Sequence, residues 1–207
     1  MKMPVANLIL GPPLEGKREL ALALTKTSLA KNIPEIYILT DDSPETLMKK
    51  FIKSNIILKQ DLIKFIDCYS HNLGIFSNDT PNIKRVSSPL AFNEISITIT
   101  ELQKEILRKW QEHQILFDSL STILLYANSS MVARFLQILI GKIKKAGGDI
   151  FLFLEEGMHD EKTIITMEHI VDGVVRVFKE REHIKITTKG TVDKKILESS
   201  AMLESQS

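Results

Sequence analysis

A segment near the N-terminus has the residue types and the spacing of a phosphate-binding loop. Residues 11–18 read Gly-Pro-Pro-Leu-Glu-Gly-Lys-Arg and match the first seven of the eight positions in the pattern G-x-x-x-x-G-K-[ST]. In such a loop the glycines let the backbone wrap around a polyphosphate, the amide groups point inward and the lysine reaches the terminal phosphates. The segment lies between an apolar run and a helical pattern, as this chemistry requires. The alternative is a Gly-Pro turn that only connects a strand to a helix.

The residues predicted to bind a cofactor are Gly11, Pro12, Pro13, Leu14, Glu15, Gly16, Lys17 and Arg18. Arg18 stands where the pattern has Ser or Thr, whose hydroxyl ordinarily ligates Mg²⁺. A guanidinium cannot coordinate a cation, so the arginine argues against ordinary Mg-ATP hydrolysis. One interpretation is that Arg18 supplies a fixed positive charge where the metal would lie, next to phosphate oxygens or a carboxylate. The other is that it points into solvent from the helix surface.

Acidic residues follow two of the apolar runs. The run at 115–117 ends in Asp118, at the edge of a sheet where phosphate-loop folds hold a metal-binding aspartate. Asp41 and Asp42 follow another run and could orient a water molecule, or they could complement the dipole of the next helix. A third pair, at 155–156, could be a second carboxylate pair facing the crevice, but we favour the interpretation that these are acidic loop residues before a helix.

Short apolar runs alternate with helical patterns along the chain, which is typical of a parallel sheet covered by helices on both faces. The predicted strands are residues 5–10, 35–40, 62–68, 114–118, 149–154 and 173–178. The predicted helices are residues 17–31, 44–53, the region 89–110, and 130–146. The fold class is therefore α/β.

Three further segments complete the predicted organisation. The polar stretch 70–88 is expected to be one long loop that is mobile or faces a partner. Residues 176–178 and 183–188 predict two strands around a short charged turn. A single domain is expected over 1–192, followed by a polar tail over 193–207.

The composition excludes several classes of protein. Of 207 residues, 43% are hydrophobic and 26% charged, which rules out a disordered or fibrous chain. A net charge of +1 gives no bulk electrostatic reason to bind nucleic acid or an anionic membrane. The single cysteine, Cys68, excludes a disulfide scaffold and a cysteine-based zinc site. With no apolar run long enough for a signal peptide or a membrane span, a cytoplasmic protein is expected.

With these motifs in this order, the chain resembles the RecA superfamily, and within it the archaeal branch related to the KaiC ATPases of circadian clocks and the RadA-like recombinase paralogs. Besides the loop, the resemblance rests on residues 36–45, 116–122, 154–158, 171–175 and 189–191. It implies a RecA-like core that binds ATP and often assembles as a ring or filament with nucleotide at the subunit boundaries. The implied partners are a nucleotide and a second copy of the chain or a related RecA-like protein; nucleic acid is possible by analogy.

The resemblance also implies roles for single residues. Lys17 would contact phosphates, Asp118 would hold Mg²⁺, and Asp41 or Asp42 would stand where a glutamate pair activates water. These aspartates are shorter than glutamate by a methylene, roughly 1 to 1.5 Å, and a displacement of that size can cost about a hundredfold in rate.

A second departure lies in the last strand, where the lysine expected to reach a neighbour's nucleotide is Thr187, which leaves only Lys189. The predicted function is an ATP-binding protein with weak or lost hydrolysis that acts as a nucleotide-responsive or regulatory interaction module. The alternatives are a slow Mg-dependent ATPase related to DNA repair or signalling, and a structural pseudo-ATPase that binds no nucleotide.

Overall fold

A computed structural model describes residues 3–180 and 183–205. It shows an α/β fold built on one mixed β-sheet. Its eight strands lie in the order β4-β3-β2-β5-β6-β1-β7-β8, and only β8 runs antiparallel to its neighbour. The strands are β1 Ala6–Gly11, β2 Glu35–Leu39, β3 Ile63–Asp67, β4 Ile83–Arg85, β5 His113–Asp118, β6 Gly148–Glu155, β7 Gly173–Glu180 and β8 His183–Gly190. The mostly parallel sheet and its C-terminal antiparallel strand pair confirm the predicted α/β fold class.

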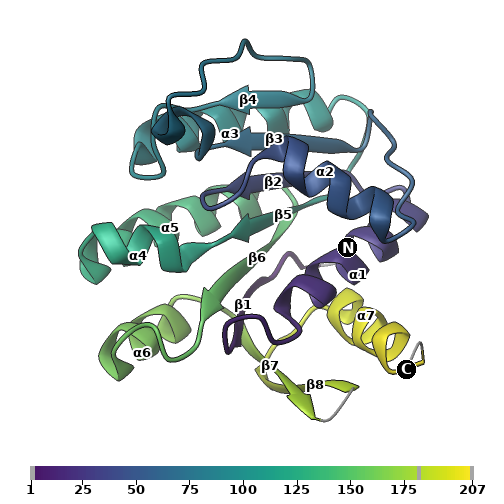
Figure 1. Cartoon of the computed structure of the whole chain (residues 1–207), viewed down its shortest axis with the longest axis vertical. Helices are drawn as coiled ribbons and strands as arrows, with labels where there is room; N and C mark the ends of the chain where they lie inside the picture. The colour runs from purple at the N-terminus through teal and green to yellow at the C-terminus, as the bar shows by residue number, and fades with distance from the viewer. Residues whose placement is uncertain (1–2, 181–182, 206–207) are drawn as a thin grey trace.

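Helices cover both faces of the sheet (Figure 1). They are α1 Lys17–Ala30, α2 Pro44–Lys53, α3 Phe92–Ile106, α4 Leu120–Tyr126, α5 Ser129–Lys145, α6 Glu161–His169 and α7 Lys194–Ser205, with a short 3₁₀ turn, η1, at Ser70–Leu73. One hydrophobic core lies under α1, α2 and α7, and the other under α3, α4, α5 and α6. In the described ranges, no helix is both long enough and apolar enough to cross a bilayer.

The apolar runs are continuous because the central strands are buried on both faces. In β6, Ile150, Leu152 and Leu154 pack into one core, while Phe151 and Phe153 pack into the other. Side chains of a strand alternate between its faces, so a strand between two helical layers needs apolar residues at nearly every position. This is why the sequence locates six strands to within one or two residues.

The segment from 194 to 205 is a helix, where a polar tail was expected. In α7, Ile196 is fully buried, Ser199 Oγ lies 3.0 Å from Thr27 Oγ1 of α1, and Lys195 Nζ donates to Asp149 Oδ2 at 2.9 Å. The lysine and aspartate side chains are each only 5% exposed. The helix therefore packs on the protein through Ile196 together with buried polar side chains, a pattern that a search for apolar periodicity does not recognise.

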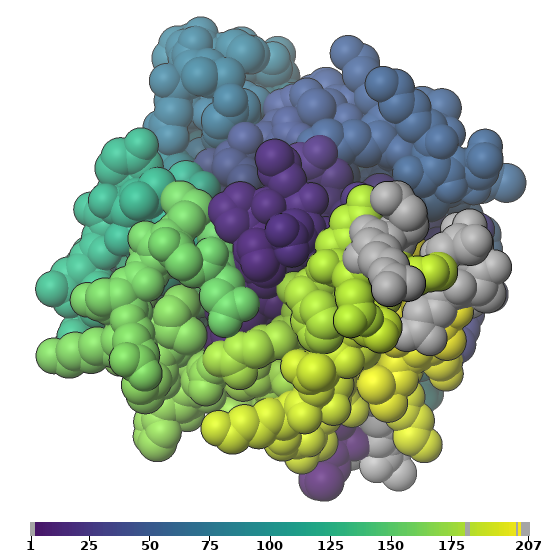
Figure 2. Space-filling model, turned by 60° about the horizontal axis from the view of Figure 1, so that its bottom comes forward, coloured from purple at the N-terminus to yellow at the C-terminus, as the bar shows by residue number. Residues whose placement is uncertain are grey.

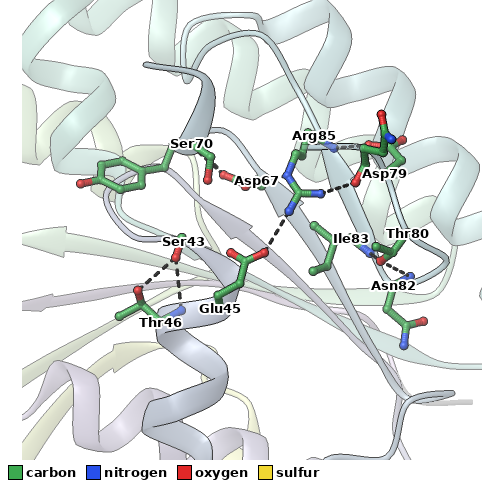
Figure 3. A network of polar contacts seen from close by, with 12 residues as sticks. Ser43, Glu45, Thr46, Asp67, Ser70, Asp79, Thr80, Asn82, Ile83 and Arg85 are labelled. Atoms are coloured by element: carbon green, nitrogen blue, oxygen red, sulfur yellow. Dashed lines mark hydrogen bonds and ion pairs between the residues drawn. The ribbon is translucent and has the colours of Figure 1, made fainter. Parts of the chain in front are cut away.

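The stretch 70–88 is also more ordered than the predicted loop, because it contains η1 and the edge strand β4. Figure 3 shows the polar network that holds it. Arg85 Nη2 donates to Glu45 Oε1 of α2 at 2.9 Å, and its Nε lies 3.4 Å from Asp67 Oδ2, an ion pair without hydrogen-bond geometry. Asp67 Oδ1 accepts from the amide of Ser70 at 2.9 Å. This arginine, 6% exposed, joins the edge of the sheet to the start of α2.

Candidate functional site

The loops after β1, β2, β5 and β6 meet at one edge of the sheet, because these strands are parallel and their carboxyl ends point the same way. They enclose a pocket of about 950 Å³, counting its open mouth, between α1 and α2. Its polar lining includes Lys17, Arg18, Asp41, Lys50, Asp118 and Glu155. Figure 2 shows the purple N-terminal segment at the surface, between the green segment that follows β6 and the yellow-green strands β7 and β8.

The glycines of the 11–18 loop occupy positions that exclude a side chain. Gly16 has φ +78°, and a Cβ there would lie 2.9 Å from Val177 Cγ1 and 3.0 Å from Ile184 Cγ2. A Cβ on Gly11 would lie 2.5 Å from the carbonyl oxygen of Val177. The loop is therefore packed closely against β7 and β8. Leu14 also has a positive φ, 63°, and its side chain is 91% exposed.

Several amide groups of this loop are free to bind a ligand. The Glu15 amide lies 3.4 Å from the Pro12 carbonyl oxygen. Within the described ranges, no hydrogen bond occupies the amides of Leu14, Gly16, Lys17 and Arg18. The first amides of a helix lack partners inside it and lie at the positive end of its dipole. We call residues 11–18, with these amides and the two closely packed glycines, the cradle.

Lys17 lies inside this cradle and is 8% exposed. Its Nζ donates to the carbonyl oxygens of Gly11 at 2.7 Å and Pro12 at 2.5 Å, and to Glu155 Oε2 at 3.0 Å. An ammonium group has three protons, so all of its donors are used. The predicted phosphate-binding lysine is therefore at the loop but is held by the protein itself.

Glu155 was expected to be either an ordinary loop residue, the favoured interpretation, or part of a carboxylate pair facing the crevice. It is the last residue of β6, lies beside Gly11 in the strand register and lines the pocket. Its amide donates to Ser121 Oγ at 2.8 Å, and the next amide, of Glu156, donates to Gly11 O at 2.8 Å. Its place after an apolar run, like that of Asp118, is the signal that could have identified it. The Glu156 side chain instead lies near Arg176, 3.4 Å from its Nε.

The structure brings Asp41 and Asp118 into the pocket. Burial, followed by the charge of Asp41, raises the pKa of Asp118 to about 7, although Lys50 and Arg18 act in the opposite direction. Partial desolvation and the charge of Asp42 also raise the pKa of Asp41. Asp42 itself forms an ion pair with Lys50 and accepts from the amide after it at 2.8 Å.

Arg18 lies in the first turn of α1, is exposed and lines the pocket. It makes no hydrogen bond with Asp118 or Asp42, and its charge acts on Asp118 through space. Among the described residues, no three His, Cys, Asp or Glu side chains are grouped as metal ligands. Because an arginine also replaces the usual hydroxyl, the residues present do not fit a preformed Mg²⁺ site. Thr187 and Lys189 lie on the edge strand β8, where both are exposed.

Comparison with known proteins gives a family and a fold. Residues 6–177 match a family of unknown function, DUF7504, and no curated protein matches the chain. A similar solved structure is the uncharacterized protein PH0321 from Pyrococcus horikoshii, in complex with an unknown peptide; its TM-score is 0.69 at 14% identity, over 94% of this chain and 86% of that chain. Another is the KaiC-like protein PH0186 from Pyrococcus horikoshii OT3, with a TM-score of 0.56 at 14% identity over 89% and 77%. These neighbours support a RecA-like fold.

Proposed function

The chain belongs to the DUF7504 family of unknown function, and we propose that it is a RecA-like protein that binds ATP or a related nucleoside triphosphate at the 11–18 loop and hydrolyses it weakly or not at all. The observation that carries the proposal is the buried Lys17 in a cradle of unpartnered amides, flanked by two positions that only glycine fits.

The loop amides and Lys17 would hold the phosphates, and Arg18 would add a fixed positive charge on the side of Asp118. Hydrolysis is expected to be weak for two reasons. Asp42 is engaged by Lys50, and Asp41 is a methylene shorter than the glutamate that this position resembles. When a nucleotide is bound but not hydrolysed, the occupancy of the site itself carries information. We therefore place the protein among nucleotide-responsive interaction modules, and the peptide found with PH0321 supports a polypeptide partner.

Thermal unfolding with and without ATP, each in Mg²⁺ and in EDTA, tests the proposal. A ligand that binds only the folded state at a hundred times its Kd adds about 2.7 kcal/mol, or roughly 5–10 °C for a chain of this size. We expect this rise in the wild type and in Lys26→Ala, which removes an exposed lysine from the same helix, and its loss in Lys17→Ala. A rise that persists in EDTA would assign the role of the metal to Arg18. No rise with millimolar ATP in any of these proteins would refute nucleotide binding.

One observation favours a second candidate, a structural pseudo-ATPase. Lys17 donates all three of its hydrogen bonds to the protein itself, as expected for a loop that has lost its ligand. Against it, Arg18 makes no hydrogen bond with Asp118 or Asp42, so the arginine does not close the pocket. The same thermal experiment separates the two candidates. The unfolding temperature of a structural protein would not change with ATP, and Lys17→Ala would only lower its stability.

A further inference from the structure

We propose that Glu155 is an internal competitor for Lys17, so that the site accepts only anions with enough charge and length to displace it, namely polyphosphates and nucleoside polyphosphates. This inference rests on the proposed function and adds the residue that sets the affinity of the site. Neither the phosphate-loop pattern nor the resemblance assigns Glu155 such a role.

Every proton of the Lys17 ammonium group is already used in a hydrogen bond. Its Nζ donates to two loop carbonyl groups and to Glu155 Oε2, so it has no proton left for a phosphate oxygen. A ligand must therefore replace at least one of these bonds. The carboxylate is the only anion among the three acceptors, so it is the one with which an incoming phosphate competes for the positive charge of Lys17.

The placement of Glu155 is rigid. The amides of Glu155 and Glu156 are held by Ser121 and Gly11, and the residue is paired in register with β1. The side chains of Lys17 and Glu155 are 9% and 24% exposed, so solvent screens their ion pair less than it would on the surface. A prepositioned and partly desolvated carboxylate is an effective competitor, because its binding to Lys17 needs little ordering.

The other charged groups of the pocket discriminate between small and extended anions. Asp41 and Asp118 line the same pocket, so a small anion that reached only Lys17 would also meet these carboxylates. A chain of phosphates extends beyond Lys17 and can contact the unpartnered loop amides and Arg18 as well. These extra contacts offset the loss of the pair between Lys17 and Glu155, whereas orthophosphate gains too few of them.

The test is calorimetric titration of the full chain with sodium tripolyphosphate, and separately with ATP, both in EDTA. Charge-assisted hydrogen bonds in partly buried positions shift equilibria by roughly tenfold or more. We therefore expect Glu155→Gln to raise the affinity for both ligands by about tenfold and by the same factor, because the competition takes place at Lys17 and not at the base. The control, Glu156→Gln, makes the same charge change on the adjacent residue and should alter affinity less than twofold.

A double mutant separates competition from a general change in charge. In a Lys17→Ala background, which is expected to lose ligand binding, Glu155→Gln should restore no detectable binding of either ligand. Equal affinities of the wild type and Glu155→Gln, weaker binding by the variant, or the same gain in Glu156→Gln would each overturn this inference and leave the proposed function standing. If neither anion binds either protein, both fail.

A second, more conservative variant keeps the inference testable if Glu155→Gln does not fold. Glu155→Asp keeps the charge but retracts the carboxylate from Lys17 by one methylene, so a smaller gain in affinity is expected than for Glu155→Gln. Covalent labelling of Lys17 with acetic anhydride, read by mass spectrometry on the ligand-free proteins, should be faster in both variants. An unchanged labelling rate would show that Glu155 does not hold the amine, and would overturn the inference.

Discussion

Replacing Glu35 by Gln should make the protein more stable above pH 7 and leave it unchanged in acid. Glu35 is the first residue of β2 and is 0% exposed. Its Oε1 accepts from Gln114 Nε2, and its Oε2 has no hydrogen-bond partner among the described residues. Burial raises the pKa of this carboxyl to about 7, although Thr25, Gln114, Ser28 and Lys195 act in the opposite direction. The folded protein thus favours the neutral acid, which glutamine imitates in shape.

The direction and size of the effect follow from proton linkage. Between pH 4.5 and 7 the unfolded chain loses the Glu35 proton while the folded protein keeps it, so the free energy of unfolding falls as the pH rises. Below this window the effect is absent, and above it the full cost of the buried charge is present. A difference between 4.5 and about 7 corresponds to on the order of 3 kcal/mol. This is an upper value, because a buried charge can draw in water.

Urea unfolding of the wild type and Glu35→Gln at pH 5, 6, 7 and 8 measures this difference. The control is Glu198→Gln, which removes an exposed carboxylate paired with Lys31. We expect the stability gap between Glu35→Gln and the wild type to open from pH 5 to about pH 7 and to level off by pH 8, while the control shows no such trend. A gap that is constant with pH, or a variant that is the less stable protein at pH 8, would refute the reasoning.

The remaining predictions concern the loop. Gly16→Ala should destabilise the protein by about 2 kcal/mol in urea, because its φ is positive and the new Cβ meets Val177 and Ile184; Gly141→Ala, in α5 with open space around it, should stabilise by up to about 1 kcal/mol, and similar effects at both sites would contradict this account. Arg18→Thr restores the usual hydroxyl, so calorimetric affinity for ATP should fall in EDTA and rise when Mg²⁺ is added, with faster phosphate release; unchanged affinity in EDTA would show that the arginine does not contact the ligand.

The fold could be predicted where burial leaves a simple mark on the sequence. Central strands such as β1 and β6 are apolar at most positions because both faces are covered. Ser43 with Pro44 marks the start of α2, where Ser43 Oγ accepts from the Thr46 amide at 3.2 Å. Helix α7 and strand β4 could not be found in this way. The first docks through Lys195 and polar hydroxyls, and the second is a three-residue edge strand held by Arg85.

The site was predictable as a set of positions but not as a set of partners. A strand followed by an acid predicts that the acid lies at the carboxyl edge, and Asp41, Asp42 and Asp118 all line the pocket there. It does not say which strands are neighbours. Glu155 and Lys17 are 138 positions apart in the chain, and their contact depends on β6 lying next to β1. Only the strand order, which is a property of the whole sheet, reveals that pair.

The interior position of β1 also determines when the loop can form during folding. β1 is paired on one side with β6 and on the other with β7, so its neighbours come from the last third of the chain. Contacts between residues so distant along the chain are slow to form, because a long loop must close first. The strands β2, β3 and β5 are adjacent in the sheet and span a shorter stretch, so they can assemble earlier. A half-folded chain would thus already possess the β3-β2-β5 part of its sheet while the cradle around Lys17 is still absent, and ligand added during refolding should bind only in the final kinetic phase.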